Sequence, residues 1–442
     1  MTGIKRLSLL LLVLFFVLFT GCEKIDLGGK TSEAPNETLS PQEKGVLTVK
    51  TSLSGTDCFR PQGSADPDAD RILEKIAAVE KEFGVTIRVD TVSEDTLAED
   101  FASQTLAGGK YADVVQTNAL TLTRHYENGT LLSLAQAGLS PSESGVLKTV
   151  DGVAYALRPD GWMNPAPTAS FLLFYNGKIL SDGQLESPLA LYEEGHWNWA
   201  NFMKLCKDVG DLAPGELYTF SKPTETEMDL VWATLHAHGA AYFDKDGVCI
   251  MDSSKVQTAF ANLKTLISSK HIYSLGSVIN PTADPTAKQA FLNGRTVFYV
   301  GNAAEFFDSS EESFSHVLRE DLRIIGFPSA SEKATGVSFT QQDAFIGVTA
   351  AANKDLCKTV LPALFAPAEG EDPVGEFLER HFYHEEDGAL YFDLLKKADT
   401  HSLLWADKHL ATVEDLFWDV TNGGSAKEIL SNLQTMFNEG KG

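Results

Sequence analysis

The segment Val46-Leu47-Thr48-Val49-Lys50-Thr51 opens the folded part of the chain as a strand rich in β-branched residues. Apolar residues at helical spacing follow, then a helix-ending glycine and a second strand, Val85-Thr86-Ile87-Arg88-Val89. A second helix over 97–106 leads to a third short strand, Asp113-Val114-Val115. Strands that alternate with helices at this spacing predict a parallel, doubly wound α/β sheet.

The sequence beyond this unit is richer in helix. At roughly 100–200 residues per domain, a length of 442 residues indicates two or three units. We expect helices at 199–209 and 228–238 and further strands at 171–175, 296–300, 323–327 and 345–348.

The charge of the chain is strongly negative. Its 61 acidic and 36 basic residues give a formal net charge of −25. Nucleic acids and other polyanions bind to cationic surfaces, so this balance disfavours both as partners. Charge of this size favours solubility and says little about the fold.

The N-terminus indicates export. Lys5 and Arg6 precede an apolar run from Leu7 to Phe19, which fits a signal peptide and is too short to span a bilayer as a helix. Small residues then lead to Cys22, as in a bacterial lipobox, although Phe19 stands where leucine is usual. We predict a signal peptide over 1–21, acylation of Cys22 and a flexible tether over 22–45. An ordinary secretory signal with a chance cysteine is the alternative.

Motifs for catalysis, metals and cofactors are missing from the sequence. It has no phosphate-binding loop and no G-x-S-x-G elbow, and its Asp and His pairs lack the spacing of metal sites. We therefore expect no enzyme activity, no cofactor and no metal. The remaining cysteines are expected to be separate thiols or to form at most one pair: Cys58, Cys206, Cys249 and Cys357.

Several local patterns together resemble the sugar-binding family of ABC importer proteins to which maltose-binding protein belongs. They occur in family order and cover roughly residues 46–440. The matching segments are Tyr111-Ala112-Asp113-Val114-Val115, 129–134, 150–159, Phe174-Tyr175-Asn176-Gly177-Lys178, 195–199, 239–247 and 290–296.

The resemblance implies an α/β, two-lobe periplasmic-binding-protein fold of type II. In such a fold, hinge strands join the lobes and the ligand is held in the cleft between them. By analogy, the chain would cross between lobes near 156–169, 296–301 and 340–345. Lobe one is then expected at 46–158 plus 298–342, and lobe two at 159–297 plus 343–442.

The function implied is that of a monomeric, lipid-anchored binding component on the outer face of the cell membrane or in the periplasm. It would capture a carbohydrate, most simply an oligosaccharide, by lobe closure and deliver it to the permease. Two alternatives stay open. One is the same fold binding a peptide, a polyamine or another non-sugar solute, and the other, more remote, is a secreted glycoside hydrolase.

Sugar sites combine flat aromatic platforms with planar polar side chains. Under this family reading, the expected platforms are Trp162, Trp232 and Trp418, each with core packing as its alternative. The expected polar partners are Asp57, Asn118, Arg158, Asn302, Gln342 and Asp343.

Overall fold

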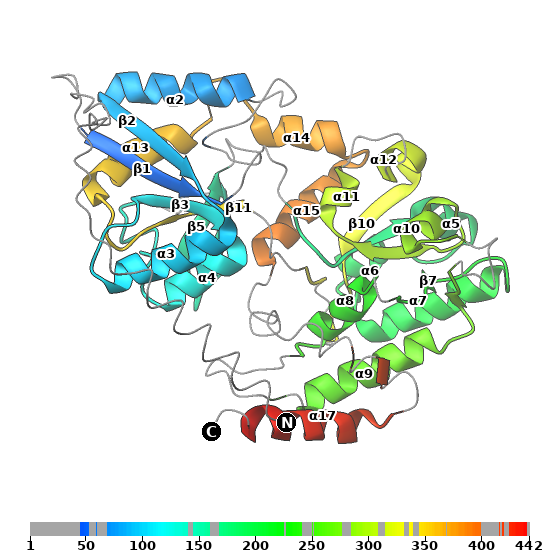
Figure 1. Cartoon of the computed structure of the whole chain (residues 1–442). Coiled ribbons are helices and arrows are strands. Elements are labelled where there is room, and N and C mark those ends of the chain that lie inside the picture. Colours follow the sequence, from blue (N-terminus) through cyan, green and yellow to red (C-terminus); the bar gives the residue numbers. More distant parts are fainter. Residues whose placement is uncertain are drawn as a thin grey trace, which may run out of the picture. The chain divides into compact units, whose positions relative to one another are not determined.

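Strand β1 (Gly45–Thr51) pairs in parallel with β2 (Val85–Thr91) and with β3 (Val114–Asn118), as the sequence predicts. The structure is a computed structural model, shown in Figure 1. It describes residues 45–52, 59, 69–139, 145–159, 168–224, 227–240, 250, 252–275, 284–307, 314–330, 336–338, 344–367, 369–398, 415, 418–419 and 424–439.

Three later strands complete a six-stranded sheet in the order β2-β1-β3-β11-β5-β4. Strand β11 (Ala344–Val348) runs antiparallel to β3 and to β5 (Val153–Pro159), and β4 (Gly145–Val150) runs antiparallel to β5. The parallel part of the sheet is therefore limited to its first three strands.

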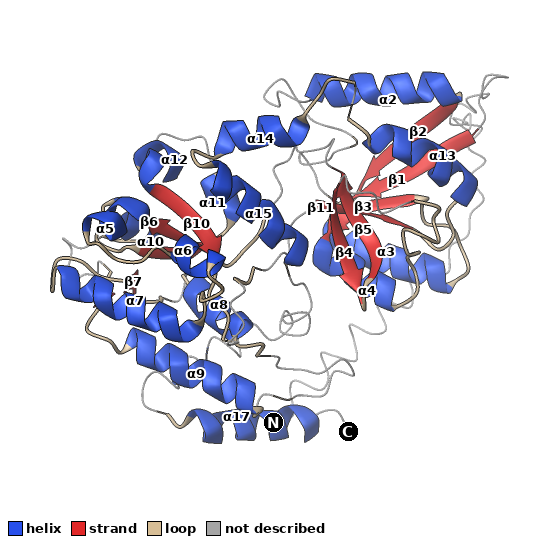
Figure 2. Cartoon of the chain, turned by 180° about the vertical axis from the view of Figure 1, so that it is seen from behind, coloured by secondary structure: helices blue, strands red, loops and turns tan. Residues whose placement is uncertain are grey.

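Helices cover both faces of this sheet, as Figure 2 shows. Val114 of β3 belongs to the apolar cluster with α2 (Ala69–Phe83) and α13 (Lys354–Phe365). Its neighbour Val115 belongs to the cluster with α3 (Glu94–Leu106) and α4 (Ala119–Glu127). Successive side chains of a strand point to opposite faces, so a strand that is buried along its whole length, as β3 is, needs a covering layer on each side.

A second sheet has the order β10-β6-β9, in which β6 (Leu172–Asn176) is central and antiparallel to both neighbours. Its outer strands are β9 (Phe298–Gly301) and β10 (Leu322–Gly326). Two parts of the expected division are therefore wrong. The strands within 298–342 pair with β6 rather than with the first sheet, and β11, expected in lobe two, is a strand of the first sheet.

The remaining elements surround the second sheet and a short parallel pair, β7 (Phe220–Ser221) with β8 (Ile272–Tyr273). The helices of this part are α5 (Gly177–Asp182), α6 (Pro188–Glu193), α7 (Trp199–Leu212), α8 (Asp229–Ala237), α9 (Ser254–Ile267), α10 (Ala287–Leu292), α11 (Ala303–Phe306), α12 (Phe314–Val317), the 3₁₀ turn Arg319–Asp321, α14 (Pro373–His381), α15 (Glu385–Lys397) and α17 (Ala426–Glu439).

Helix α15 packs against strands of both sheets, β10 and β4. Lys148 of β4 is 3% exposed, and its ammonium donates hydrogen bonds to the carbonyls of Ala398 at 2.9 Å and Leu395 at 3.4 Å. A cation is favourable at the carbonyl end of a helix, so Lys148 holds the end of α15.

Every helix among the described residues is too short or too polar to cross a bilayer.

Candidate ligand-binding site

A polar cluster lies at the carboxyl ends of the parallel strands β1 and β3. Glu94 accepts hydrogen bonds from the hydroxyls of Ser52, Thr117 and Thr121, with distances of 2.7 Å from Thr117 Oγ1 to Oε2 and from Thr121 Oγ1 to Oε1. Ser52 and Thr117 are also 2.8 Å apart through their hydroxyl oxygens. We name these four residues the edge cluster. Ligands of open α/β sheets commonly bind outside this edge of the strands.

Two helix starts bring the edge cluster together. Ser93 caps α3 by accepting from the Thr96 amide at 3.2 Å, which places Glu94 in the first helical turn, where the helix dipole favours a carboxylate. Asn118 caps α4 by accepting from the Thr121 amide at 2.8 Å. The predicted site residue Asn118 is thus 8% exposed and supports the cluster as a helix cap.

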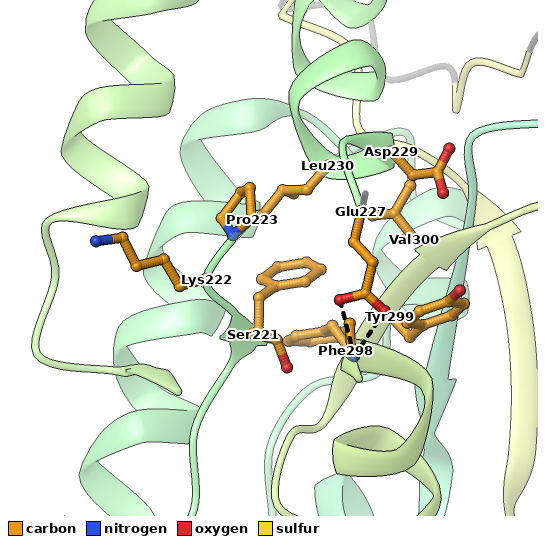
Figure 3. Close-up of a pocket in the computed structure, with 11 residues that line it drawn as sticks. Ser221, Lys222, Pro223, Glu227, Asp229, Leu230, Phe298, Tyr299 and Val300 are labelled. Atoms are coloured by element: carbon orange, nitrogen blue, oxygen red, sulfur yellow. Dashed lines mark hydrogen bonds between the residues drawn. The ribbon is translucent and has the colours of Figure 1, made fainter. Parts of the chain in front are cut away.

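A second polar site surrounds the start of α8, beside β7 and β9. A pocket here is lined by Phe220, Ser221, Lys222, Pro223, Glu227, Asp229, Leu230, Ala287, Phe298, Tyr299 and Val300, as Figure 3 shows. We name it the acidic pocket. Glu227 accepts from the Ala287 amide at 3.0 and 3.1 Å. The Tyr299 hydroxyl donates to Glu305 Oε2 at 2.9 Å, which adds a third carboxylate next to the lining.

Desolvation, with neighbouring carboxylates as the smaller cause, disfavours ionisation in the acidic pocket. Desolvation by the surrounding protein, followed by the negative charges of Glu305 and Glu227, raises the pKa of Asp229 to about 6, although this side chain keeps contact with solvent. Desolvation, opposed by the Ala287 amide and reinforced by Glu305, also raises the pKa of Glu227. Desolvation and Glu305 raise the pKa of Tyr299. A cation placed here would relieve this repulsion.

Two predicted polar residues have structural hydrogen bonds. Asn302 caps α11 through a capping box with Glu305, and its amide nitrogen donates to Ser170 Oγ at 3.1 Å. Arg158 lies on β5, is 2% exposed and donates to the Ala344 carbonyl of β11 at 3.3 Å. Neither is placed in the acidic pocket or the edge cluster.

Two of the three tryptophans predicted as sugar platforms, Trp232 and Trp418, contact the apolar core. Trp232 is 9% exposed and belongs to the apolar core cluster, in a helix whose other members beyond Asp229 are buried as well. Trp418 is partly buried and packs against the same cluster. Four predicted site residues and the predicted lipidation site lie outside the described residues: Asp57, Trp162, Gln342, Asp343 and Cys22.

No group of three or more His, Cys, Asp or Glu side chains in the described part of the chain is arranged to hold a metal ion. Cys206 and Cys357 are free, buried thiols, and burial raises the pKa of each. Cys58 and Cys249 lie outside the described residues.

Sequence reasoning missed the principal groups of both sites. Glu94, Ser52 and Thr121 carry no motif and are separated along the chain, while Glu227 and Asp229 read as ordinary acidic residues before a helix. The one available signal was Asn118 after a strand, because the cluster residue Thr117 directly precedes it.

Comparisons with known proteins agree with the fold. A family model described as bacterial extracellular solute-binding protein matches residues 74–360. The chain is similar to the sugar-binding protein MalE of Xanthomonas citri, with a TM-score of 0.59, 15% identity and coverage of 89% of this chain and 96% of that one. A comparison with curated proteins found no match.

Two further solved structures are similar. The GacH receptor of Streptomyces glaucescens, solved unliganded and with acarbose, gives a TM-score of 0.52 at 14% identity, with 89% of this chain and 98% of that one covered. UgpB of Mycobacterium tuberculosis, solved with glycerophosphocholine, gives a TM-score of 0.53 at 15% identity. The match covers 89% of this chain and 97% of that one. Likeness at these identities bears on fold, and it confirms the predicted two-lobe α/β architecture.

Proposed function

The chain belongs to the bacterial extracellular solute-binding proteins, and on that premise we propose that it is the lipid-anchored binding component of an ABC importer and captures a carbohydrate. Binding by lobe closure would present the solute to the permease, because a ligand that contacts both lobes favours the closed state. The similar proteins MalE, described as sugar-binding, and GacH, solved with acarbose, support a carbohydrate as the solute.

The observation that carries the proposal is the edge cluster. Its carboxylate gathers three hydroxyl donors at the strand edge where ligands of α/β sheets bind. A sugar hydroxyl has the same donor and acceptor chemistry as Ser52 or Thr121, and can exchange with or extend such a network. Ionised acceptors give the stronger hydrogen bonds, which suits selection of a hydroxylated solute from water.

A thermal unfolding screen of the mature protein tests the solute class. The panel contains oligosaccharides of different linkages, spermidine, short peptides and glycerophosphodiesters. A true ligand at about 100 times its Kd should add about 2.7 kcal/mol to the free energy of unfolding. Stabilisation by an oligosaccharide supports the proposal, and stabilisation by a peptide or phosphodiester alone contradicts it. Chromatography of each incubated oligosaccharide should show no hydrolysis products, since products would indicate a glycoside hydrolase.

Fractionation of cells tests the anchor. If Cys22 carries a diacylglycerol, two acyl chains resist washing with salt, and a tether of 22–45 holds the folded body roughly 25 Å from the membrane. Cys22→Ala should move the protein from the membrane fraction to the medium or periplasm, whereas Cys58→Ala should leave it bound. Release of the unmodified chain by high salt would contradict lipid anchoring.

A further inference from the structure

Helix α15 is bound to the second sheet at both of its ends. Arg323 of β10 donates to both carboxylate oxygens of Asp387, in the first turn of α15, at 2.8 and 3.1 Å. Near the other end of the helix, the hydroxyl of Ser338 donates to the Leu394 carbonyl at 2.9 Å. Bidentate bonds between arginine and a carboxylate fix geometry as well as adding energy. The helix is therefore part of the lobe that holds the second sheet.

The last carbonyls of the same helix accept hydrogen bonds from the first sheet. Lys148 of β4 donates to the Ala398 and Leu395 carbonyls. Strand β4 is an edge of the first sheet, and its pairing with β5 shifts in register between Lys148 and Thr149. Bulges at sheet edges re-aim side chains, and this shift stands at the residue whose ammonium reaches α15. Lys148 therefore joins the two lobes through the end of one helix.

The contact that Lys148 makes is buried. Its side chain is almost fully enclosed, and its ammonium lies 5.3 Å from the centre of the Phe345 ring of β11. The carbonyl end of a helix carries partial negative charge, and ring faces attract cations. A buried ammonium that leaves its acceptors loses their attraction without regaining water. This contact therefore resists separation of the lobes more strongly than a surface ion pair would.

The other links between the lobes fix their orientation less firmly. The chain itself connects them between β5 and β6, between β10 and β11 and between α13 and α14. Connecting segments can absorb large changes of backbone angles, so they permit rotation of the lobes. Arg71 of α2 reaches Glu371, directly before α14, at 3.3 Å, but both side chains are more than a quarter exposed. Solvent screens an ion pair of this kind.

We propose that Lys148 is a positioning residue that sets the orientation of the two lobes relative to each other, and thereby the free-energy cost of closing them on a solute. The inference rests on the proposed function, because it concerns the lobe closure by which this protein would capture its solute. Lys148 belongs to neither the edge cluster nor the acidic pocket. Its influence on binding therefore acts through the populations of open and closed forms.

Small-angle X-ray scattering of the mature protein, with no solute added, tests the inference. The variants are Lys148→Met, which removes the donor and keeps an apolar stem, and Lys148→Gln, which keeps a donor group without the charge. The matched control is Lys397→Met, which removes an exposed lysine from the last turn of α15. Circular dichroism and urea unfolding establish beforehand that each sample is folded under the conditions of the scattering measurement.

We expect the radius of gyration of Lys148→Met to shift by on the order of 1 Å while its circular dichroism stays unchanged, and that of Lys397→Met to equal the wild-type value. Lys148→Gln should shift in the same direction by less, and it decides the question if Lys148→Met does not fold. A role limited to stability would lower the urea midpoint and leave the radius of the folded protein unchanged. That result would overturn the inference but not the proposed carbohydrate capture, because the scattering is measured without solute.

Discussion

Replacing Glu94 with glutamine removes the charge at the centre of the edge cluster and keeps its shape. Three hydroxyls donate to this carboxylate, from Ser52, Thr117 and Thr121. A hydrogen bond to a charged group is worth about 1.5–3 kcal/mol, against about 0.5–1.5 kcal/mol for a neutral pair. The amide also presents an NH₂ group where an acceptor is needed, so at least one hydroxyl must reorient or lose its partner.

Glu94 is half-buried, so solvent screening reduces the contribution of each of its three hydrogen bonds to stability. We therefore expect Glu94→Gln to lower the free energy of unfolding by about 1–3 kcal/mol, including a small loss of interaction with the α3 dipole. Glu99→Gln on the exposed side of the same helix is the control and should stay within about 0.5 kcal/mol of the wild type.

Urea unfolding measures the stability of both variants. The urea concentration at the midpoint should fall for Glu94→Gln, while the dependence of the free energy of unfolding on urea should stay unchanged if only stability is altered. If the proposed function is right, the oligosaccharide selected by the thermal screen should bind more weakly after Glu94→Gln than after Glu99→Gln. If Glu94→Gln unfolds at the wild-type midpoint and binds normally, the edge cluster is neither a stabilising network nor part of the binding site.

Three further outcomes follow from buried side chains. Trp232→Ala should cost about 3–5 kcal/mol of stability because Trp232 packs in the core, whereas the partly buried Trp418→Ala should cost less, and thermal unfolding with ligand titration distinguishes packing from stacking. Desolvation lowers the pKa of His125 to about 4. This folded value lies below the unfolded one, so His125 is expected to contribute about 3 kcal/mol above pH 6.5 that is lost as the pH falls toward 4. His125→Gln should flatten that pH dependence of the urea midpoint, and the exposed His196→Gln should not. Lys148→Met removes the ammonium that donates to the Ala398 and Leu395 carbonyls and should cost about 1–3 kcal/mol, against little for the exposed Lys397→Met, in the same urea assay.

The first three strands were predictable because local signals agree there. Segments rich in β-branched residues alternate with segments whose apolar residues have helical spacing, and a glycine ends the first helix. Strands β1, β2 and β3 pair in parallel as expected. The place of β11 was not predictable from Phe345-Ile346-Gly347-Val348 alone. A short apolar strand fits the interior of either sheet, and only long-range pairing with β3 and β5 decides between them.

The candidate sites were harder to predict for a related reason. Ser52, Glu94 and Thr117 are scattered along the chain and meet only because parallel strands end at one edge. A tryptophan such as Trp232 has the same appearance in a sequence whether it packs in a core or stacks on a sugar. Its burial is set by α8 being apolar on nearly every side, which is typical of a helix enclosed by protein.

Calorimetric titration of the mature protein with the oligosaccharide selected by the thermal screen tests the central claim most directly. The proposed function predicts saturable binding at one site per chain, with the sugar recovered intact afterwards. Failure of every carbohydrate to bind, or recovery of the sugar as cleaved products, would contradict the proposal that this protein captures a carbohydrate for an importer.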